Sequence, residues 1–203
     1  VGWATAAQME AAGTACHADG LWTFPLRDPD GSVVGIRVRT RSGKKYAVTG
    51  SDGSGLFVPS GLTGITQLIL PEGPTSAAAL LTAGFAAAGR PNNAAGADQA
   101  VRLCRRLRPT RVVVLGDNDF KPPDDKFPAG RWPGREGAES VATALRRAVP
   151  DVRVVLPPGP DHGLGPDGVK DARAWLRRAG PSGLRLELSR AIGAACRAAF
   201  AGA

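Results

Sequence analysis

Acidic residues follow two of the most apolar segments of the chain. Glu72 comes shortly after residues 67–70, and Asp117 and Asp119 follow residues 111–116, which read RVVVLG. Carboxylates held close together repel one another unless a cation offsets their charge, and such hard oxygen ligands suit Mg²⁺ or Mn²⁺. Because extended backbone points alternate side chains the same way, Asp117 and Asp119 would face one ion together. The pattern therefore predicts a divalent-metal site.

The elements that would position these acids alternate between strand and helix from residue 67 onward. We expect strands at 67–70, 111–116 and 152–156, and helices at 75–88, 97–107, 136–149 and 170–179. Such alternation predicts an α/β fold with a mainly parallel sheet and helices on both of its faces. Sites in these sheets form at the carboxyl ends of the strands, so the three acids would share one crevice if their strands are neighbours.

Each acidic position also has a simpler interpretation. Asp117-Asn118-Asp119 has the composition of an ordinary polar turn. Glu72 precedes a predicted helix, and a negative charge near a helix N-terminus is favourable without any metal. The metal-site hypothesis is favoured because both acidic positions occur together, in an order that one sheet edge would explain.

Composition divides the chain into four parts. Residues 1–20 are Ala-rich and could form a helix or a poorly packed lead-in. Residues 21–65 combine short strand-like runs with turn signals, so we expect a small basic β-rich subdomain there. The α/β domain is expected at 66–180, and a C-terminal helical tail at 181–203.

Basic residues outnumber acidic residues by 26 to 18, which gives a formal net charge of +8. This balance favours a polyanionic partner such as nucleic acid, although a soluble Arg-rich protein from a GC-rich genome would have the same composition. Arg37, Arg39 and Arg41 alternate along a predicted strand and would share one face, with Lys44 and Lys45 returning beside them. The row could bind successive phosphates. It could also be the solvated outer face of a hairpin that is protected against aggregation.

The three cysteines, Cys16, Cys104 and Cys196, lie far apart and form no CxxC pair. We therefore expect no zinc in this chain, and the sparse, odd number of cysteines suits a reducing cytoplasm. No signal peptide is visible, and the apolar run 76–89 is too short and too Ala-rich to span a bilayer, so no membrane partner is expected. Since the chain begins at Val1, we expect it to be a piece of a longer protein.

Two segments carry a resemblance to a known family. LILPEG at 68–73 and VVLGDND at 113–119, separated by a predicted helix, resemble the Toprim domain shared by bacterial-type primases, topoisomerases and certain nucleases. The later segments GREGA, LPPG and KDARAWL, which begin at Gly134, Leu156 and Lys170, are similar to the primase version of this domain. The resemblance spans about residues 66–180.

A further segment favours a primase within that family. FPLRDPDGSVVG at 24–35 looks like the strand, turn and strand that open the primase catalytic core upstream of its Toprim domain. Topoisomerases and Toprim nucleases do not usually carry this segment. The resemblance thus implies a core that makes short primers on single-stranded DNA from nucleoside triphosphates, with Mg²⁺ or Mn²⁺ as cofactor. A helicase or a zinc-binding domain outside this chain would be its partner.

The resemblance also implies roles for single residues. Asp117 and Asp119 would hold the metal ions, and Glu72 would be a further ligand or take part in proton transfer. Asp171 would be a weaker, later acidic member of the metal site. Contacts to nucleic acid or nucleotide are expected from Arg37, Arg39, Arg41, Lys44, Lys45, Arg135 and Lys170.

The chain departs from the primase pattern in several places. Asn118 stands where a glycine is more usual, residues 120–133 make a longer loop than in many primases, and Asp171 alone represents a later acidic cluster. Two other functions therefore stay open. One is a Toprim nuclease that uses the same metals, against which the segment 24–35 argues. The other is a non-catalytic module of a replication protein that binds single-stranded DNA.

Overall fold

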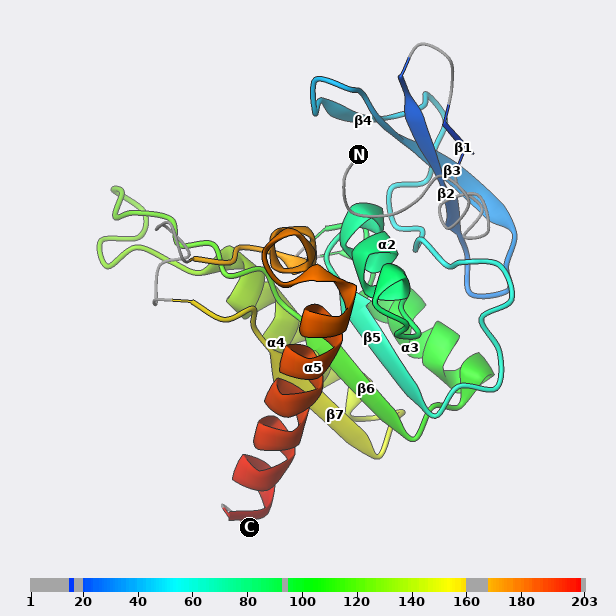
Figure 1. Cartoon of the computed structure of the whole chain (residues 1–203). Helices are drawn as coiled ribbons and strands as arrows, with labels where there is room; N and C mark the ends of the chain where they lie inside the picture. Colours follow the sequence, from blue (N-terminus) through cyan, green and yellow to red (C-terminus); the bar gives the residue numbers. More distant parts are fainter. Residues whose placement is uncertain (1–14, 17–19, 93–94, 160–167, 202–203) are drawn as a thin grey trace.

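Two sheets make up the framework of the protein (Figure 1). The computed structural model describes residues 15–16, 20–92, 95–159 and 168–201. In these residues a four-stranded antiparallel sheet, in the order β1-β2-β3-β4, precedes a three-stranded parallel sheet in the order β5-β6-β7. Most of the lead-in expected at 1–20 lies outside the described residues.

The antiparallel sheet occupies the region where a β-rich subdomain was predicted. Its strands are β1 (Ala15–Cys16), β2 (Trp22–Arg27), β3 (Val33–Arg39) and β4 (Lys45–Ala47). The turn between β2 and β3 forms because Asp28 Oδ1 accepts hydrogen bonds from the backbone N–H groups of Asp30 (3.0 Å) and Ser32 (2.9 Å). Strand β3 ends at Arg39, so the prediction that Arg41 continues the alternation on this strand is wrong, because the chain already turns there.

The parallel sheet consists of β5 (Gln67–Pro71), β6 (Arg111–Leu115) and β7 (Asp151–Val155). The strands pair in register, with Pro71 beside Leu115 and Leu115 beside Val155. The carboxyl ends of β5 and β6 are therefore neighbours, as the prediction of a shared crevice requires.

Helices cover both faces of the parallel sheet, which confirms the predicted fold class (Figure 1). The helices are α2 (Pro74–Thr82), α3 (Ala97–Leu107), α4 (Pro133–Leu145) and α5 (Ala172–Ala201). Ile69 and Val113 pack with α2 and α5 on one face, whereas Leu68 and Val112 pack with α3 and α4 on the other. Burial on both faces explains why the interior positions of β5 and β6, residues 68–70 and 112–114, are all apolar.

Three helices differ from the sequence prediction. Helix α4 spans Pro133–Leu145 instead of 136–149. Helix α2 ends at Thr82 instead of 88, because Gly84 adopts a φ of 82° and the chain then runs beside β5. Helix α5 joins most of the predicted helix at 170–179 to the described part of the tail, with a break at Gly180, where φ is 70°. Beyond the break, Leu184, Leu188 and Ile192 enter the core beside the parallel sheet.

Backbone hydrogen bonds join the two sheets through two short segments, 56–57 and 86–90. Leu56 exchanges hydrogen bonds with Arg27 of β2, and Phe57 exchanges hydrogen bonds with Gly89. The next residue, Arg90, donates its N–H to Pro71 O (2.9 Å) of β5 and accepts from Gly73 N–H (2.7 Å). A continuous ladder therefore fixes the antiparallel sheet against the strand that carries Glu72.

No helix among the described residues is long and apolar enough to cross a membrane.

At Gly89 the backbone of the ladder passes very close to the backbone of Gly73. A Cβ atom there would lie 2.6 Å from the carbonyl oxygen of Gly73, so either segment would have to move. We expect Gly89→Ala to lower the free energy of unfolding by about 1–3 kcal/mol, measured by denaturant titration. Gly53→Ala is the control, because a Cβ atom at Gly53 meets nothing within 4 Å. Equal stability of the two variants would show that the junction tolerates the extra atom.

Candidate active site between the two sheets

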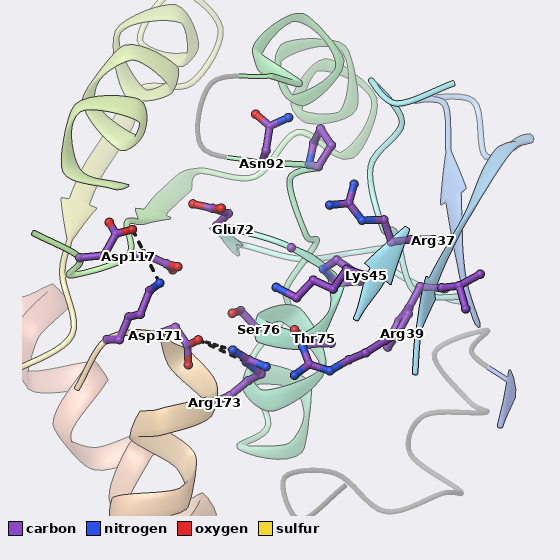
Figure 2. Close-up of a pocket in the computed structure, with 17 residues that line it drawn as sticks. Arg37, Arg39, Lys45, Glu72, Thr75, Ser76, Asn92, Asp117, Asp171 and Arg173 are labelled. Carbon is purple, nitrogen blue, oxygen red and sulfur yellow. Dashed lines mark hydrogen bonds and ion pairs between the residues drawn. The ribbon is translucent and has the colours of Figure 1, made fainter. Parts of the chain in front are cut away.

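One pocket lies between the end of the parallel sheet and the face of β3 and β4 (Figure 2). Its lining contains the four predicted metal-site acids, Glu72, Asp117, Asp119 and Asp171. Five cationic side chains also line it: Arg37, Arg39, Lys45, Lys170 and Arg173. The structure thus brings all of the predicted acids to one place, and three of the five cations, Arg37, Arg39 and Lys45, come from the antiparallel sheet.

The loop that carries Asp117 and Asp119 is held on both sides. Asn118 N–H donates to Lys170 O (2.7 Å), and Gly134 N–H at the start of α4 donates to Asp119 Oδ1 (3.1 Å). A Cβ atom at Gly134 would lie 2.3 Å from Asp117 O, so only glycine lets α4 approach this closely. The glycine-led helix start thereby fixes the backbone of both aspartates.

Burial and mutual repulsion make Asp117 hard to ionise. Burial, followed by the charges of Glu72, Asp171 and Asp119, raises its pKa to about 8. Burial also raises the pKa of Glu72, against which the positive charge of Arg90 acts. Carboxyl groups in this situation gain from any cation that enters the pocket, because it offsets both the lost solvation and the repulsion.

Arg90 lies beside the end of β5, outside the lining of the pocket, and is fully buried, at 0% exposure. Its Nε donates to Leu70 O at 3.3 Å and its Nη2 to Leu115 O at 3.4 Å, so it spans the ends of β5 and β6. Burial lowers the pKa of Arg90, and the charges of Glu72 and Asp117 act against that shift. The guanidinium is therefore a permanent positive charge within the acidic cluster.

Both carboxylate oxygens of Asp171 accept short hydrogen bonds from the start of α5. Oδ1 accepts from Ala174 N–H (2.8 Å) at the start of α5, and Oδ2 accepts from Arg173 Nη2 (2.6 Å). Burial works to raise the pKa of Asp171, but the charge and hydrogen bond of Arg173 and the Ala174 N–H outweigh it and lower the pKa. Its role as a metal ligand stays a prediction, and any ion would compete with Arg173 for it.

The cations of the opposite wall crowd one another. Figure 2 shows Arg37, Arg39 and Lys45 extending from β3 and β4 toward the acids. Burial and the nearby Arg173 lower the pKa of Arg39, and burial with Arg173 and Arg39 lowers that of Lys45. Arg39 Nη1 is buried and has no hydrogen-bond partner among the described residues. An anion between these side chains would satisfy the free donor and relieve the repulsion.

Three predicted nucleic-acid contacts lie away from this pocket. Arg41 and Lys44 are exposed around the turn between β3 and β4, and neither lines the pocket. Arg135 is exposed on α4, with its guanidinium 4.6 Å from the ring centre of Trp132. Lys170 lines the pocket, and its Nζ lies 3.7 Å from Asp119 Oδ2. Contact with nucleic acid at these positions stays a prediction.

Sequence reasoning missed two residues of the site. Arg173 belongs to the segment KDARAWL, where the spacing from Asp171 gave a usable signal, since the two pair at the start of a helix. Arg90 is a lone charge after the Ala- and Gly-rich run 83–89, where an Arg is unexpected inside an apolar core. Thr75 and Ser76, at the start of α2, also line the pocket.

The acids do not form a complete cage for one ion. In the part of the chain that the structure describes, no group of three or more His, Cys, Asp or Glu side chains is arranged to hold a metal ion. Mg²⁺ commonly binds to one or two carboxylates and completes its shell with water and substrate phosphates. The donor set therefore fits an ion that binds together with a phosphate-bearing substrate.

The chain matches solved structures, whereas no family model and no curated protein sequence matches it. The primase fragment of the bacteriophage T7 primase-helicase protein has a TM-score of 0.55 and 16% identity, covering 92% of this chain and 70% of that one. An Aquifex aeolicus primase structure with zinc-binding and RNA polymerase domains has a TM-score of 0.55 and 22% identity, covering 92% and 45%. The E. coli primase catalytic core has 0.54 and 18%, covering 91% and 59%.

These matches establish the fold. The chain has the fold of a primase catalytic core, in which a Toprim domain follows a smaller β-rich region, and this confirms the predicted resemblance. The chain spans about half the length of the bacterial primase structures, with 45% and 59% of those chains covered.

The raised pKa of Asp117 makes stability depend on pH. Asp117 ionises near 3.8 in the unfolded chain but near 8 in the folded one, so this group costs stability progressively as pH rises between these values. In metal-free buffer at about pH 8, we expect Asp117→Asn to melt several degrees above the wild type, and the difference to vanish toward pH 4. Asp125→Asn, an exposed control, should melt like the wild type throughout. A constant difference across the pH range would contradict this account.

Proposed function

We propose that this chain is the catalytic core of a primase, a nucleotidyltransferase that makes short primers on single-stranded DNA from nucleoside triphosphates. The observation that carries the proposal is the pocket itself. Acids at the ends of two parallel strands face cations of the antiparallel sheet, within the fold of a primase core. A metal-bound triphosphate would use both walls of the pocket. The acids would bind the metal ions, and the Arg and Lys side chains would bind the phosphate oxygens.

The proposed metal ligands are Asp117, Asp119 and Glu72. When bound, Mg²⁺ or Mn²⁺ neutralises triphosphate charge and makes a 3′-hydroxyl a better nucleophile. Asp117 and Asp119 lie on a loop held by Gly134 and Lys170, so their carboxylates are presented without a large rearrangement. Glu72 extends from the neighbouring strand end, either as a further ligand or as a group that accepts a proton.

The proposed triphosphate site is formed by Arg39, Lys45 and Arg173. Arg39 Nη1 has no partner among the residues described, and guanidinium groups match phosphate oxygens in charge and geometry. Arg173 already holds Asp171 at 2.6 Å, so it would bridge the two walls. Lys170 would shift from Asp119 toward the phosphate when a metal ion takes its place.

Single-stranded DNA, a helicase and a zinc-binding domain are the proposed partners. Structures similar to this chain include a DnaG primase catalytic domain bound to single-stranded DNA, which has a TM-score of 0.53 and 20% identity. Another belongs to a primase-helicase protein, and a third includes zinc-binding domains. We propose that Arg37, Arg41 and Lys44, beside the pocket or on the rim of β3 and β4, contact the template strand.

Primer synthesis is the direct test of the function. The chain is incubated with single-stranded DNA, labelled nucleoside triphosphates and Mg²⁺ or Mn²⁺. We expect short template-dependent products, reduced on the order of a hundredfold or more in Asp117→Ala/Asp119→Ala, because the metal site is lost. Asp124→Ala/Asp125→Ala, in the exposed loop that follows, is the matched control and should retain activity.

Other outcomes of that assay would replace the proposal. Degradation of the DNA without nucleotides, lost in the same double variant, would identify a Toprim nuclease. Binding of single-stranded DNA without any metal-dependent product would identify a non-catalytic binding module.

Arg39 tests the triphosphate site separately. We expect Arg39→Ala to raise the KM for nucleoside triphosphate about tenfold, with a smaller change in kcat, because a charge-assisted hydrogen bond is lost. Arg41→Ala, two residues along and outside the pocket, is the control and should leave this KM unchanged. Equal KM values in the two variants would remove Arg39 from the triphosphate site.

A further inference from the structure

Arg90 is the one fully buried charged side chain among the described residues. A charged group is rarely found at 0% exposure unless opposite charges and hydrogen bonds compensate for the water it has lost. Arg90 extends from the segment that joins the two sheets, with its backbone hydrogen-bonded to Pro71 and Gly73 on either side of Glu72. Its position is therefore fixed by the sheet rather than by side-chain packing alone.

The guanidinium of Arg90 connects the two acidic strand ends. It donates to Leu70 O, at the end of β5, and to Leu115 O, at the end of β6. Glu72 and Asp117 follow these strands, and both act electrostatically on Arg90, with Glu72 the stronger. Arg90 does not line the pocket, so it does not reach the position that a substrate would occupy.

Arg90 therefore combines two functions in one side chain. Hydrogen bonds to the two carbonyl groups hold the strand ends together, and the positive charge offsets the repulsion between the carboxylates that those ends carry. A side chain that only tied the strands together would not need a charge, since a neutral amide also donates hydrogen bonds. The charge is explained by the acids.

We propose that Arg90 is a positioning residue, a fixed internal cation that holds Glu72 and Asp117 side by side at the strand ends and so pre-forms the acidic cluster before a divalent cation binds. The inference rests on the proposed function only in assigning a divalent cation to this cluster. Removing the charge of Arg90 leaves these half-buried acids beside one another without their internal cation, and a charge that loses its compensating partner in the protein interior is costly.

A double-mutant cycle on folding stability tests this inference. Arg90→Met, Glu72→Gln and the combination of the two are compared with the wild type by thermal unfolding in metal-free buffer. Arg90→Met alone should lower the melting temperature on the order of 10 °C. In the Glu72→Gln background, at least half of that loss should disappear, because the repelling charge is gone. Arg111→Met, whose partner Asp151 lies at the opposite end of the sheet, is the matched control and should show no such coupling.

The outcomes are distinct. Coupling between Arg90 and Glu72, absent for Arg111, supports the inference. An equal loss in both backgrounds would overturn it and reduce Arg90 to a tie between the strands. If Arg90→Met alone does not fold, recovery of a folded Arg90→Met/Glu72→Gln chain supports the inference, and failure to recover it overturns it. Primer synthesis is not measured in this cycle, so its result is independent of whether the proposed function holds.

Discussion

The backbone ladder through residues 56–57 and 86–90 is the constraint on which the site depends. It carries hydrogen bonds from Arg27 of β2 through Phe57 and Gly89 to the end of β5. Without it, the acids of the parallel sheet and the cations of β3 would belong to separate units with no fixed distance between them. Phe24 and Phe57 reinforce the junction by packing edge to face at 5.8 Å, where both side chains are fully buried. Backbone hydrogen bonds therefore fix the relative position of the two sheets that contribute side chains to the pocket.

Like charges lie close together in each wall of the pocket, carboxylates in one and Arg and Lys side chains in the other. Repulsion and burial raise the pKa of Asp117, whereas burial and like charges lower those of Arg39 and Lys45. A ligand with metal ions on one side and phosphate groups on the other would reduce the repulsion among the acids and among the basic side chains together. For this reason we favour a metal-bound triphosphate.

The strands and most of the helices could be predicted from the sequence, whereas the buried cation Arg90 beside the acids could not. The strands before Glu72 and Asp117 are apolar after their first residue, and that local signal predicted the parallel sheet and the convergence of the acids. The helix predicted at 75–88 was too long, because an Ala-rich run has high helix propensity but the last part of it pairs with β5 instead. Arg90 could not be assigned because its partners lie on two strands distant in sequence. Arg41 was placed on β3 because the alternation continues past the residue at which the strand ends.

A crystal structure of the chain with Mn²⁺ and a non-hydrolysable nucleoside triphosphate tests the central claim most directly. The account predicts an anomalous Mn²⁺ signal beside the carboxylates of Asp117 and Asp119, with the triphosphate between that ion and the guanidinium groups of Arg39 and Arg173. A triphosphate bound on another surface, or Mn²⁺ bound away from these aspartates, would contradict the assignment of the pocket as the active site.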